Sequence, residues 1–249
     1  MSTQPHAIVM LRRNFKHIAR NPTSVFNAVL MPIVIMLMFV YMFGKAFAVG
    51  VDYIDYATPG LMLLAVCYGL GSTATAVNSD MTKGIINRFK AMDVSRGAVL
   101  TGHVVATVLT NLVAIAALTG VAFALGFSPA ASALDWLGVV GVVVLLGSAA
   151  GWFTVALGLF AKSPETAGLA AVPLVMLPFF SSAIVPADKM GPGLREFAEY
   201  QPFTPIIETL RGLLAGTPSG HDAMIAVAWC IAIAVVGYVW ASSTFKKRA

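Results

Sequence analysis

Charged residues are scarce in this chain. Of its 249 residues, only 11% are Asp, Glu, Lys or Arg, whereas a soluble domain carries about 25%. A water-soluble globule of this length needs more polar surface, and a disordered chain would not be 58% hydrophobic. The mean hydropathy of +0.84 agrees. The composition therefore predicts an integral membrane protein.

Motifs for catalysis and nucleotide binding are absent from the sequence. No G-x-x-x-x-G-K-[ST] occurs, so the chain is not expected to hydrolyse ATP by a P-loop of its own. It contains no H-E-x-x-H and no G-x-S-x-G, and its four histidines are scattered. The two cysteines, Cys67 and Cys230, fall inside apolar stretches, where thiols usually only pack. We expect no catalytic residue, no metal ligand and no cofactor in this chain.

Long apolar stretches dominate what is present. A helix needs roughly 20 apolar residues to cross about 30 Å of hydrocarbon. Six stretches qualify, which predicts an all-α integral membrane fold forming a single transmembrane domain over residues 1–249. They are residues 24–43, 58–77, 99–127, 136–161, 166–185 and 223–243.

The first stretch has a competing interpretation as a secretory signal. Basic residues precede it, and Ala46-Phe47-Ala48 follows it like an A-x-A cleavage site. The apolar core of a signal is usually about 7–15 residues, and this one is longer. We therefore favour a retained span.

Small residues and prolines mark particular places in these stretches. Pro32 interrupts the first, and Pro173 and Pro178 interrupt the fifth, where freed carbonyls need other partners. Gly147-x-x-x-Gly151 permits close helix approach in the fourth, and Gly212-x-x-x-Gly216 permits it after the fifth. For both motifs, packing within the chain is the default interpretation.

The basic residues predict the orientation of the chain. If the N-terminus is cytoplasmic, 12 of the 16 Lys and Arg residues fall in inner segments. Only Lys45, Lys189, Arg195 and Arg211 then lie outside. Inner loops of membrane proteins carry such an excess. We expect both termini to be cytoplasmic, and the net charge of +5 to reflect orientation and not nucleic-acid binding.

Residues 6–20 have two helical faces. Ile8, Leu11 and Phe15 follow one another at spacings of three and four, and Arg12 and Lys16 repeat every four on a neighbouring face. This pattern is typical of a helix that lies in the membrane interface with its basic side toward anionic headgroups. The alternative is a solvated basic tail that only sets topology.

Residues 78–97 form the longest predicted inner loop. Within it, residues 83–92 read as a short amphipathic helix with Ile85, Phe89 and Met92 on its apolar side and Lys83 and Arg88 on its polar side. Such a helix either lies on the membrane or docks into a groove on a partner. Periodicity alone does not separate these two outcomes.

Residues 186–221 form a long predicted outer segment between the fifth and sixth spans. It is rich in proline and contains an amphipathic helix, residues 206–216, too short to cross the membrane. A helix of this length at a membrane is usually re-entrant or interfacial. Glu208 and Arg211 are three residues apart and can pair on its polar face.

The order of these elements, together with two motifs, resembles ABC-2 type transporter permeases, of which drug-export permeases of the daunorubicin-resistance type are the nearest group. One motif runs Gln201-Pro202-Phe203-Thr204-Pro205 and then from Glu208 through Arg211-Gly212 to Gly216. The other runs Lys83-Gly84 through Arg88, then Val94-Ser95-Arg96 and Gly102-His103. The chain departs from the family pattern at Ile85-Ile86-Asn87, at Asp93 where proline is common, and at His103 where lysine is common.

The resemblance implies a membrane subunit of an ATP-driven exporter in a bacterial or archaeal cell membrane. Two permease chains, identical or related, would pair with two copies of a separate ATP-binding subunit that holds ATP and Mg. Residues 6–20 would form a connecting helix beside the membrane lipids, and residues 186–221 would form outer re-entrant helices. The substrate would be an amphipathic drug, antibiotic or lipid-like molecule.

The resemblance also implies roles for particular residues. A coupling helix in the inner loop would contact the ATP-binding subunit through Lys83, Gly84, Ile85, Arg88, Phe89, Met92 and Arg96. The outer re-entrant signature would consist of Pro202, Pro205, Glu208, Arg211 and Gly212. A conduit lined by the first, second and fifth spans would contain Met36, Phe39, Ser72, Thr75, Phe179, Ser181 and Ser182.

Two other function classes remain open from the sequence. The chain could be a membrane scaffold or assembly factor that recruits partners without moving a substrate. It could also be an ion-coupled transporter or channel, although no predicted span holds an internal acid that would relay protons. Association with an ATP-binding subunit separates the exporter from both.

Overall fold

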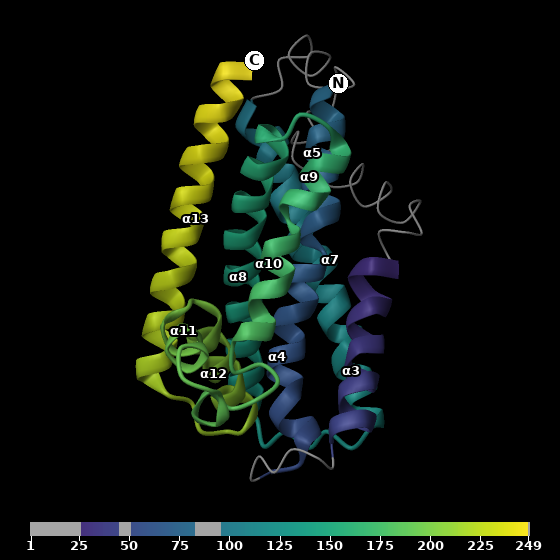
Figure 1. Ribbon diagram of the computed structural model, residues 1–249, viewed down its shortest axis with the longest axis vertical. Coiled ribbons are helices and arrows are strands. Elements are labelled where there is room, and N and C mark those ends of the chain that lie inside the picture. Colours follow the sequence, from purple (N-terminus) through teal and green to yellow (C-terminus); the bar gives the residue numbers. More distant parts are fainter. Residues whose placement is uncertain (1–25, 45–50, 83–95, 249) are drawn as a thin grey trace.

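The computed structural model describes residues 26–44, 51–82 and 96–248, and every regular element in these ranges is a helix. The longest helices run antiparallel in one bundle (Figure 1). We call the end that holds the C-terminus the upper end and the opposite end the lower end. The predicted all-α class is confirmed for the described residues.

The helices differ greatly in length along the chain. In order they are η1 (Phe26–Leu30), α3 (Met31–Phe43), α4 (Tyr53–Tyr68), α5 (Leu70–Thr82), α7 (Arg96–Ala124), α8 (Ala133–Phe160), α9 (Pro164–Ala170), α10 (Val172–Met176), η2 (Leu177–Phe180), η3 (Ala187–Lys189), α11 (Leu194–Tyr200), α12 (Phe203–Leu214) and α13 (Gly220–Arg248).

Four of the six predicted spans are confirmed as helices long and apolar enough to cross a membrane. They are Tyr53–Thr82, Val99–Ala124, Ala133–Phe160 and Gly220–Lys247. The other two predicted spans correspond to shorter apolar helices, Ala28–Met42 and Pro164–Phe180. The count of six spans therefore stays a prediction.

The ends of α7 and α8 are set by local capping. The predicted third span reaches residue 127, but α7 ends at Ala124 because Gly126 takes a left-handed φ of 101°. The amides of Gly126 and Phe127 then donate to the carbonyls of Phe123 and Ala122, which closes the helix. At the start of α8, Ser132 and Asp135 form a capping box.

Prolines divide the predicted fifth span. Pro164 begins α9, Pro173 is the second residue of α10, and Pro178 is the second residue of η2. The prediction of a helix through residue 185 is wrong for its last five residues, since 181–185 form turns. Proline lacks an amide hydrogen and is tolerated best in the first turn of a helix, which agrees with a new helix starting at each of these three prolines.

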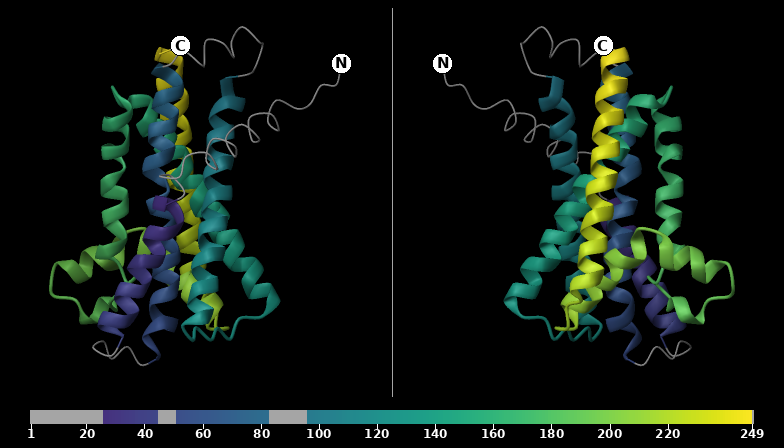
Figure 2. Two further views of the ribbon diagram at one scale, coloured as in Figure 1. Left: turned by 90° about the vertical axis from the view of Figure 1, so that its right-hand side faces the viewer. Right: turned by 90° about the vertical axis from the view of Figure 1, so that its left-hand side faces the viewer.

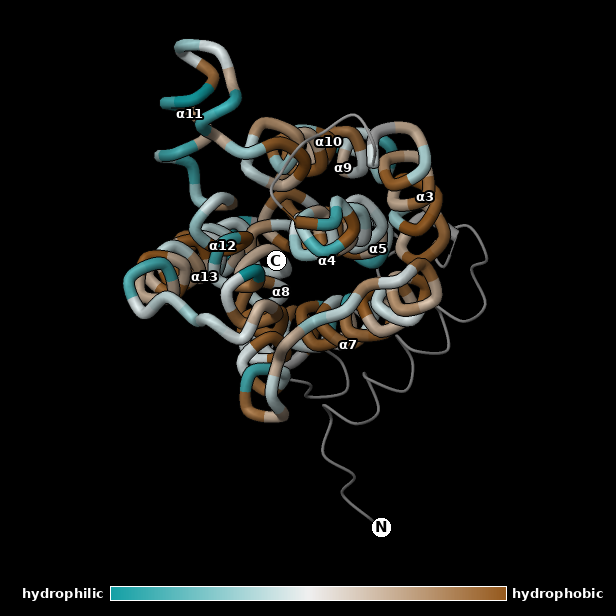
Figure 3. The backbone as a smooth tube through the Cα atoms, turned by 90° about the horizontal axis from the view of Figure 1, so that it is seen from below, coloured by the Kyte–Doolittle hydropathy of each residue, from teal (hydrophilic) through white to brown (hydrophobic). Residues whose placement is uncertain are grey.

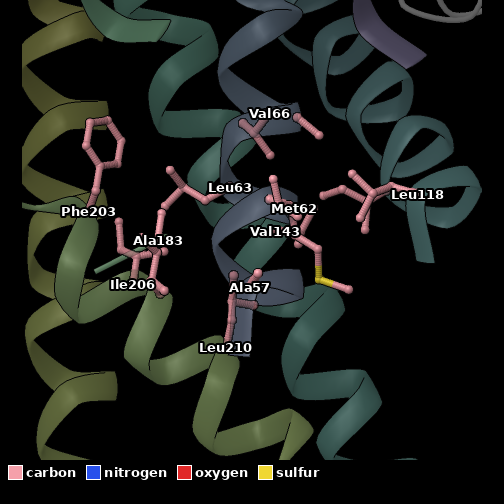
Figure 4. Close-up of a cluster of buried hydrophobic side chains, with 14 of the residues drawn as sticks. Ala57, Met62, Leu63, Val66, Leu118, Val143, Ala183, Phe203, Ile206 and Leu210 are labelled. Carbon is pink, nitrogen blue, oxygen red and sulfur yellow. The ribbon is translucent and has the colours of Figure 1, made fainter. Parts of the chain in front are cut away.

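Helix α4 is the centre of the hydrophobic core. Fourteen of its 16 residues are buried. Met62, Leu63 and Val66 of α4 lie in one cluster with Leu118 of α7 and Val143 of α8 (Figure 4). A helix that is covered on all sides carries apolar residues all round, which explains the unbroken apolar run from Leu61 to Cys67 in α4.

Glycines bring neighbouring helices into close contact. A Cβ atom at Gly147 or Gly151 of α8 would lie 3.2–3.5 Å from side-chain atoms of Val108 or Val104 of α7. This confirms that the G-x-x-x-G motif of the fourth span serves packing within the chain. A Cβ at Gly237 of α13 would lie 2.5 Å from the backbone nitrogen of Phe153, so α13 and α8 touch at their backbones.

The outward face of α13 is apolar and exposed. Val235, Val236 and Val239 are each more than half exposed, and brown, hydrophobic segments lie on the outside of the bundle in Figure 3. In water such a surface would be unstable, whereas lipid chains solvate it. The exposed face is therefore consistent with a helix that borders lipid.

Candidate functional site

The segment 181–185 is irregular backbone at the lower end of the bundle, between α4 and α12 (Figure 1). Figure 2 shows that the chain after it, including α11, projects sideways from this end. Irregular backbone at membrane depth is tolerated only where other protein groups satisfy its N–H and C=O groups. The partners of these groups therefore define the site.

Side chains from other helices satisfy the carbonyls of this segment. The carbonyl of Ser182 accepts hydrogen bonds from the Tyr56 hydroxyl at 2.9 Å and from Arg211 Nη2 at 2.9 Å. The neighbouring carbonyls are also paired. Gln201 Nε2 donates to the Phe180 carbonyl at 3.1 Å, and the Tyr53 hydroxyl donates to the Ile184 carbonyl at 3.4 Å.

Arg211 of α12 connects its own helix to α4 and to segment 181–185. Its Nη1 pairs with Glu208 Oε1, which confirms the predicted i,i+3 ion pair. The Ser182 hydroxyl donates to the same Glu208 oxygen at 2.7 Å. The Arg211 guanidinium carbon also lies 3.9 Å from the centre of the Tyr56 ring, a cation–π distance. We call Tyr56, Ser182, Glu208 and Arg211 the Arg211 cluster.

Close apolar packing supports the Arg211 cluster. A Cβ atom at Gly60 of α4 would lie 2.4 Å from the carbonyl oxygen and 2.5 Å from the Cα of Ala183. Only glycine lets the irregular segment approach α4 so closely. Ala183 lies beside Ile206 and Leu210 of α12 in Figure 4, so the apolar face of α12 covers the segment from the other side.

The remaining signature residues shape the two ends of α12. Pro202 caps the helix, and Pro205 lies in its first turn, where a missing amide hydrogen costs nothing. At the other end Gly216, with φ of 70°, closes the helix: its amide donates to Leu213, and the amide of Thr217 donates to Gly212. The second G-x-x-x-G motif is thus a helix cap.

Gly212 is also restricted by a close contact. A Cβ atom there would lie 3.0 Å from the carbonyl oxygen of Thr217 and 3.4 Å from the Cα of Pro218. All five signature residues therefore build α12 or join it to its neighbours. The arrangement connects α12 to α4 and to segment 181–185 at the lower end of the bundle.

The residues predicted for a conduit lie in three places. Met36 is fully buried in the core, and Phe39 and Phe179 pack against that core. Ser181 and Ser182 are buried in the irregular segment. The structure thus brings Ser182 into the Arg211 cluster, whereas it places Met36 in the general core.

The other two conduit residues, Ser72 and Thr75, lie on α5 and are partly exposed. The Ser72 hydroxyl donates to the Gly69 carbonyl at 2.8 Å, and the Thr75 hydroxyl donates to the Pro164 carbonyl at 3.3 Å. Thr75 therefore ties α5 to the start of α9. Across the part of the chain that the structure describes, no group of three or more His, Cys, Asp or Glu residues is placed to hold a metal ion.

Most of the predicted coupling residues lie outside the described residues: Lys83, Gly84, Ile85, Arg88, Phe89 and Met92. The predicted connecting helix at residues 6–20 also lies outside them. Arg96 is the first residue of α7. At the other edge of the predicted loop 78–97, α5 continues to Thr82, so the loop is helical at both of its described edges.

Sequence reasoning missed the residues that α4 contributes. Tyr53 and Tyr56 lie before the predicted start of the second span at residue 58, so neither was included in a predicted helix. Gly60 was not singled out either. The available signal was the spacing of Tyr53, Tyr56 and Gly60 by three and then four residues, which places them on one face of α4.

Comparisons with known proteins cover nearly the whole chain. Residues 6–215 match the family described as ABC-2 type transporter. The chain is 30% identical over 234 residues to the daunorubicin resistance ABC transporter permease protein DrrB1 of Streptomyces coeruleorubidus, covering 93% of this chain and 81% of that protein. It is 26% identical over 222 residues to the probable doxorubicin resistance ABC transporter permease protein DrrC of Mycobacterium tuberculosis, covering 88% and 80%.

Proposed function

The chain belongs to the ABC-2 type transporter family, and from that premise we propose that it is the membrane subunit of an ATP-driven exporter. Its substrate is an amphipathic drug, antibiotic or lipid-like molecule that it moves out of the cell. The observation that carries the proposal is the match over residues 6–215, which includes every described helix from η1 to α12 together with segment 181–185. The two relatives named above are described as drug-resistance permeases.

The energy for transport comes from a partner chain. The sequence has no P-loop motif, so ATP and Mg bind to a separate ATP-binding subunit. Two permease chains and two of these subunits form the working transporter. The loop that contains Lys83, Gly84, Ile85, Arg88, Phe89 and Met92 docks on the ATP-binding subunit as the coupling helix.

The upper end of the bundle faces the cytoplasm in this proposal. Lys162 follows the end of α8, and Lys246 and Lys247 lie at the end of α13; both helices end at the upper end of the bundle. The positive-inside rule favours this orientation. The lower end then faces outward, and the Arg211 cluster holds the irregular segment rigidly in the outer half of the membrane while the conduit beside it opens and closes.

Coupling through the inner loop has a direct test. The chain is purified with its ATP-binding subunit and reconstituted in liposomes, and daunorubicin-stimulated ATP hydrolysis is measured. We expect the double variant Arg88→Ala/Phe89→Ala to lose at least about tenfold of the stimulated rate. An aromatic residue and an arginine are typical anchors of a docked helix, removing one anchor costs about 2 kcal/mol, and about 1.4 kcal/mol already corresponds to tenfold.

A matched control uses the same residue types at the other end of the bundle. Arg195 and Phe197 lie on α11 and are both exposed, so Arg195→Ala/Phe197→Ala is expected to leave the stimulated rate unchanged. An undiminished rate in the Arg88 and Phe89 variant would refute the coupling assignment. A chain that never co-purifies with an ATP-binding subunit favours the scaffold alternative, and substrate flux without that subunit favours an ion-coupled transporter.

A further inference from the structure

The upper ends of α5 and α7 are joined by a shielded acid–base contact. His103 Nε2 of α7 lies 3.3 Å from Asp80 Oδ2 of α5, and the two side chains are only 9% and 13% exposed. Asp80 is three residues before segment 83–95 and His103 is eight residues after it. The contact therefore closes the base of the segment that connects these two helices.

A second contact joins the same helices further down the bundle. The hydroxyl oxygens of Thr73 and Thr107 are 2.8 Å apart, and Thr107 also donates to the backbone carbonyl of His103 at 2.9 Å. On α5, Thr73 and Asp80 are seven residues apart, which is two helical turns. The two contacts therefore join α5 and α7 at two levels along the bundle.

Helix α5 is also fixed to the end of α8. Asn78 Nδ2 donates to the carbonyls of Gly158 at 3.0 Å and Ala161 at 2.7 Å, so it satisfies two carbonyls at that helix end. A Cβ atom at Gly158 would lie 2.6 Å from the Ala74 carbonyl oxygen, so the two backbones touch. The upper ends of α5, α7 and α8 thus form one tightly connected unit.

We propose that Asp80 and His103 are positioning residues for coupling, which keep the upper ends of α5 and α7 together so that a push on segment 83–95 displaces both helices as one body. The inference rests on the proposed function, in which that segment receives the movement of the ATP-binding subunit. Without the contact, the two helices separate at their upper ends. The push is then absorbed there and does not reach the lower end.

The first test measures how much substrate moves per ATP hydrolysed in the reconstituted complex. For Asp80→Asn and for His103→Leu we expect ATP hydrolysis to persist while substrate moved per ATP falls about tenfold, within the range of coupling effects seen for such positions. His103→Lys places a cation opposite Asp80 and is expected to retain transport close to wild type. A purely structural role would lower ATP hydrolysis and transport together and would leave the substrate moved per ATP unchanged.

The chain offers a matched control pair for these variants. His221 and Asp222, at the start of α13, also lie near each other, with Nδ1 and Oδ1 3.5 Å apart, but the His221 side chain is 78% exposed. His221→Leu and Asp222→Asn are expected to leave substrate per ATP unchanged. An unchanged ratio in the Asp80→Asn variant of a wild-type complex that transports normally would overturn the inference and leave the proposed function intact.

The second test locks the helices together. Thr73→Cys and Thr107→Cys, in a background with Cys67→Ala and Cys230→Ala, places two thiols where hydroxyls now touch, which suits a disulfide. If α5 and α7 move as one body, the oxidised double-cysteine protein transports as well as the reduced one. Transport that stops on oxidation and returns on reduction shows that the helices must separate, and this result overturns the inference.

Discussion

Arg211→Leu should destabilise the protein by about 3 kcal/mol and abolish most transport, because the substitution leaves several groups without their partner. The Glu208 carboxylate loses its cation, and the carbonyl of Ser182 loses one of its two donors. The Arg211 side chain is 17% exposed, so water replaces these contacts poorly. Thermal unfolding in detergent, followed by transport in liposomes, measures both effects.

The control for this prediction is a second arginine in a similar local setting. Arg195 pairs with Glu199 four residues later on α11, at 2.7 Å, but both side chains are more than 40% exposed. Exposed pairs of this kind contribute only about 0.3–0.5 kcal/mol. Arg195→Leu should therefore unfold close to the wild-type temperature, and an equal loss in both variants would show that the Arg211 cluster has no special role.

Gly60→Leu should have a comparably large effect through packing. Its first side-chain carbon would already lie 2.4 Å from the carbonyl oxygen of Ala183, and backbone cannot move aside as a flexible side chain does. Overpacking of a core costs about 1–3 kcal/mol, and here it also pushes segment 181–185 away from Tyr56. We expect loss of stability together with loss of transport, measured as for Arg211→Leu.

A smaller substitution at the close contact, Gly60→Ala, has a matched control in Gly120→Ala. Gly120 lies within α7, is exposed, and has no atom within 4 Å of an added Cβ. There the alanine should stabilise the helix by roughly 1 kcal/mol, because it restricts the unfolded chain more than glycine does. Gly60→Ala is expected to change stability in the opposite direction. Equal, stabilising effects at both positions would show that the close contact at Gly60 is absent.

The Arg211 cluster shows which parts of the site were predictable from the sequence. Glu208 and Arg211 are three residues apart on one helix, so their pairing follows from helical geometry alone. Tyr56 and Ser182 are 126 residues apart, and Arg211 and Tyr56 are 155 apart. No periodicity links such distant positions, so these contacts become visible only once α4, α12 and segment 181–185 are placed together.

The helices show a similar division. Four spans were predictable because long apolar runs in helical form have few alternatives in a membrane protein. Their ends were harder, because they depend on individual contacts. The second span was predicted to begin at residue 58, yet α4 begins at Tyr53, and the Asp55 carboxylate accepts a hydrogen bond from the amide of Ser128 at 3.0 Å.

The prolines of the fifth stretch were correctly expected to interrupt it, but the result of the interruption was not. A proline leaves helix carbonyls without their usual donor, but its position in the sequence does not predict which group will donate to them instead. Here the satisfied groups extend past the prolines to Ser182 and Ile184, and their partners come from α4 and α12. The end of the fifth helix is therefore set by tertiary contacts and not by local sequence.

The contacts of segment 181–185 also impose an order on biosynthesis. Tyr53 and Tyr56 are made before the segment, whereas Arg211 follows Ser182 by 29 residues. At about 5–20 residues per second the ribosome delivers that arginine a few seconds after Ser182. Until then, the nascent segment has part of its hydrogen bonding unmet and is poorly suited to hydrocarbon. The lower end of the bundle is thus assembled late, after α12 has been translated, and the fifth stretch cannot settle into the membrane as an independent helix.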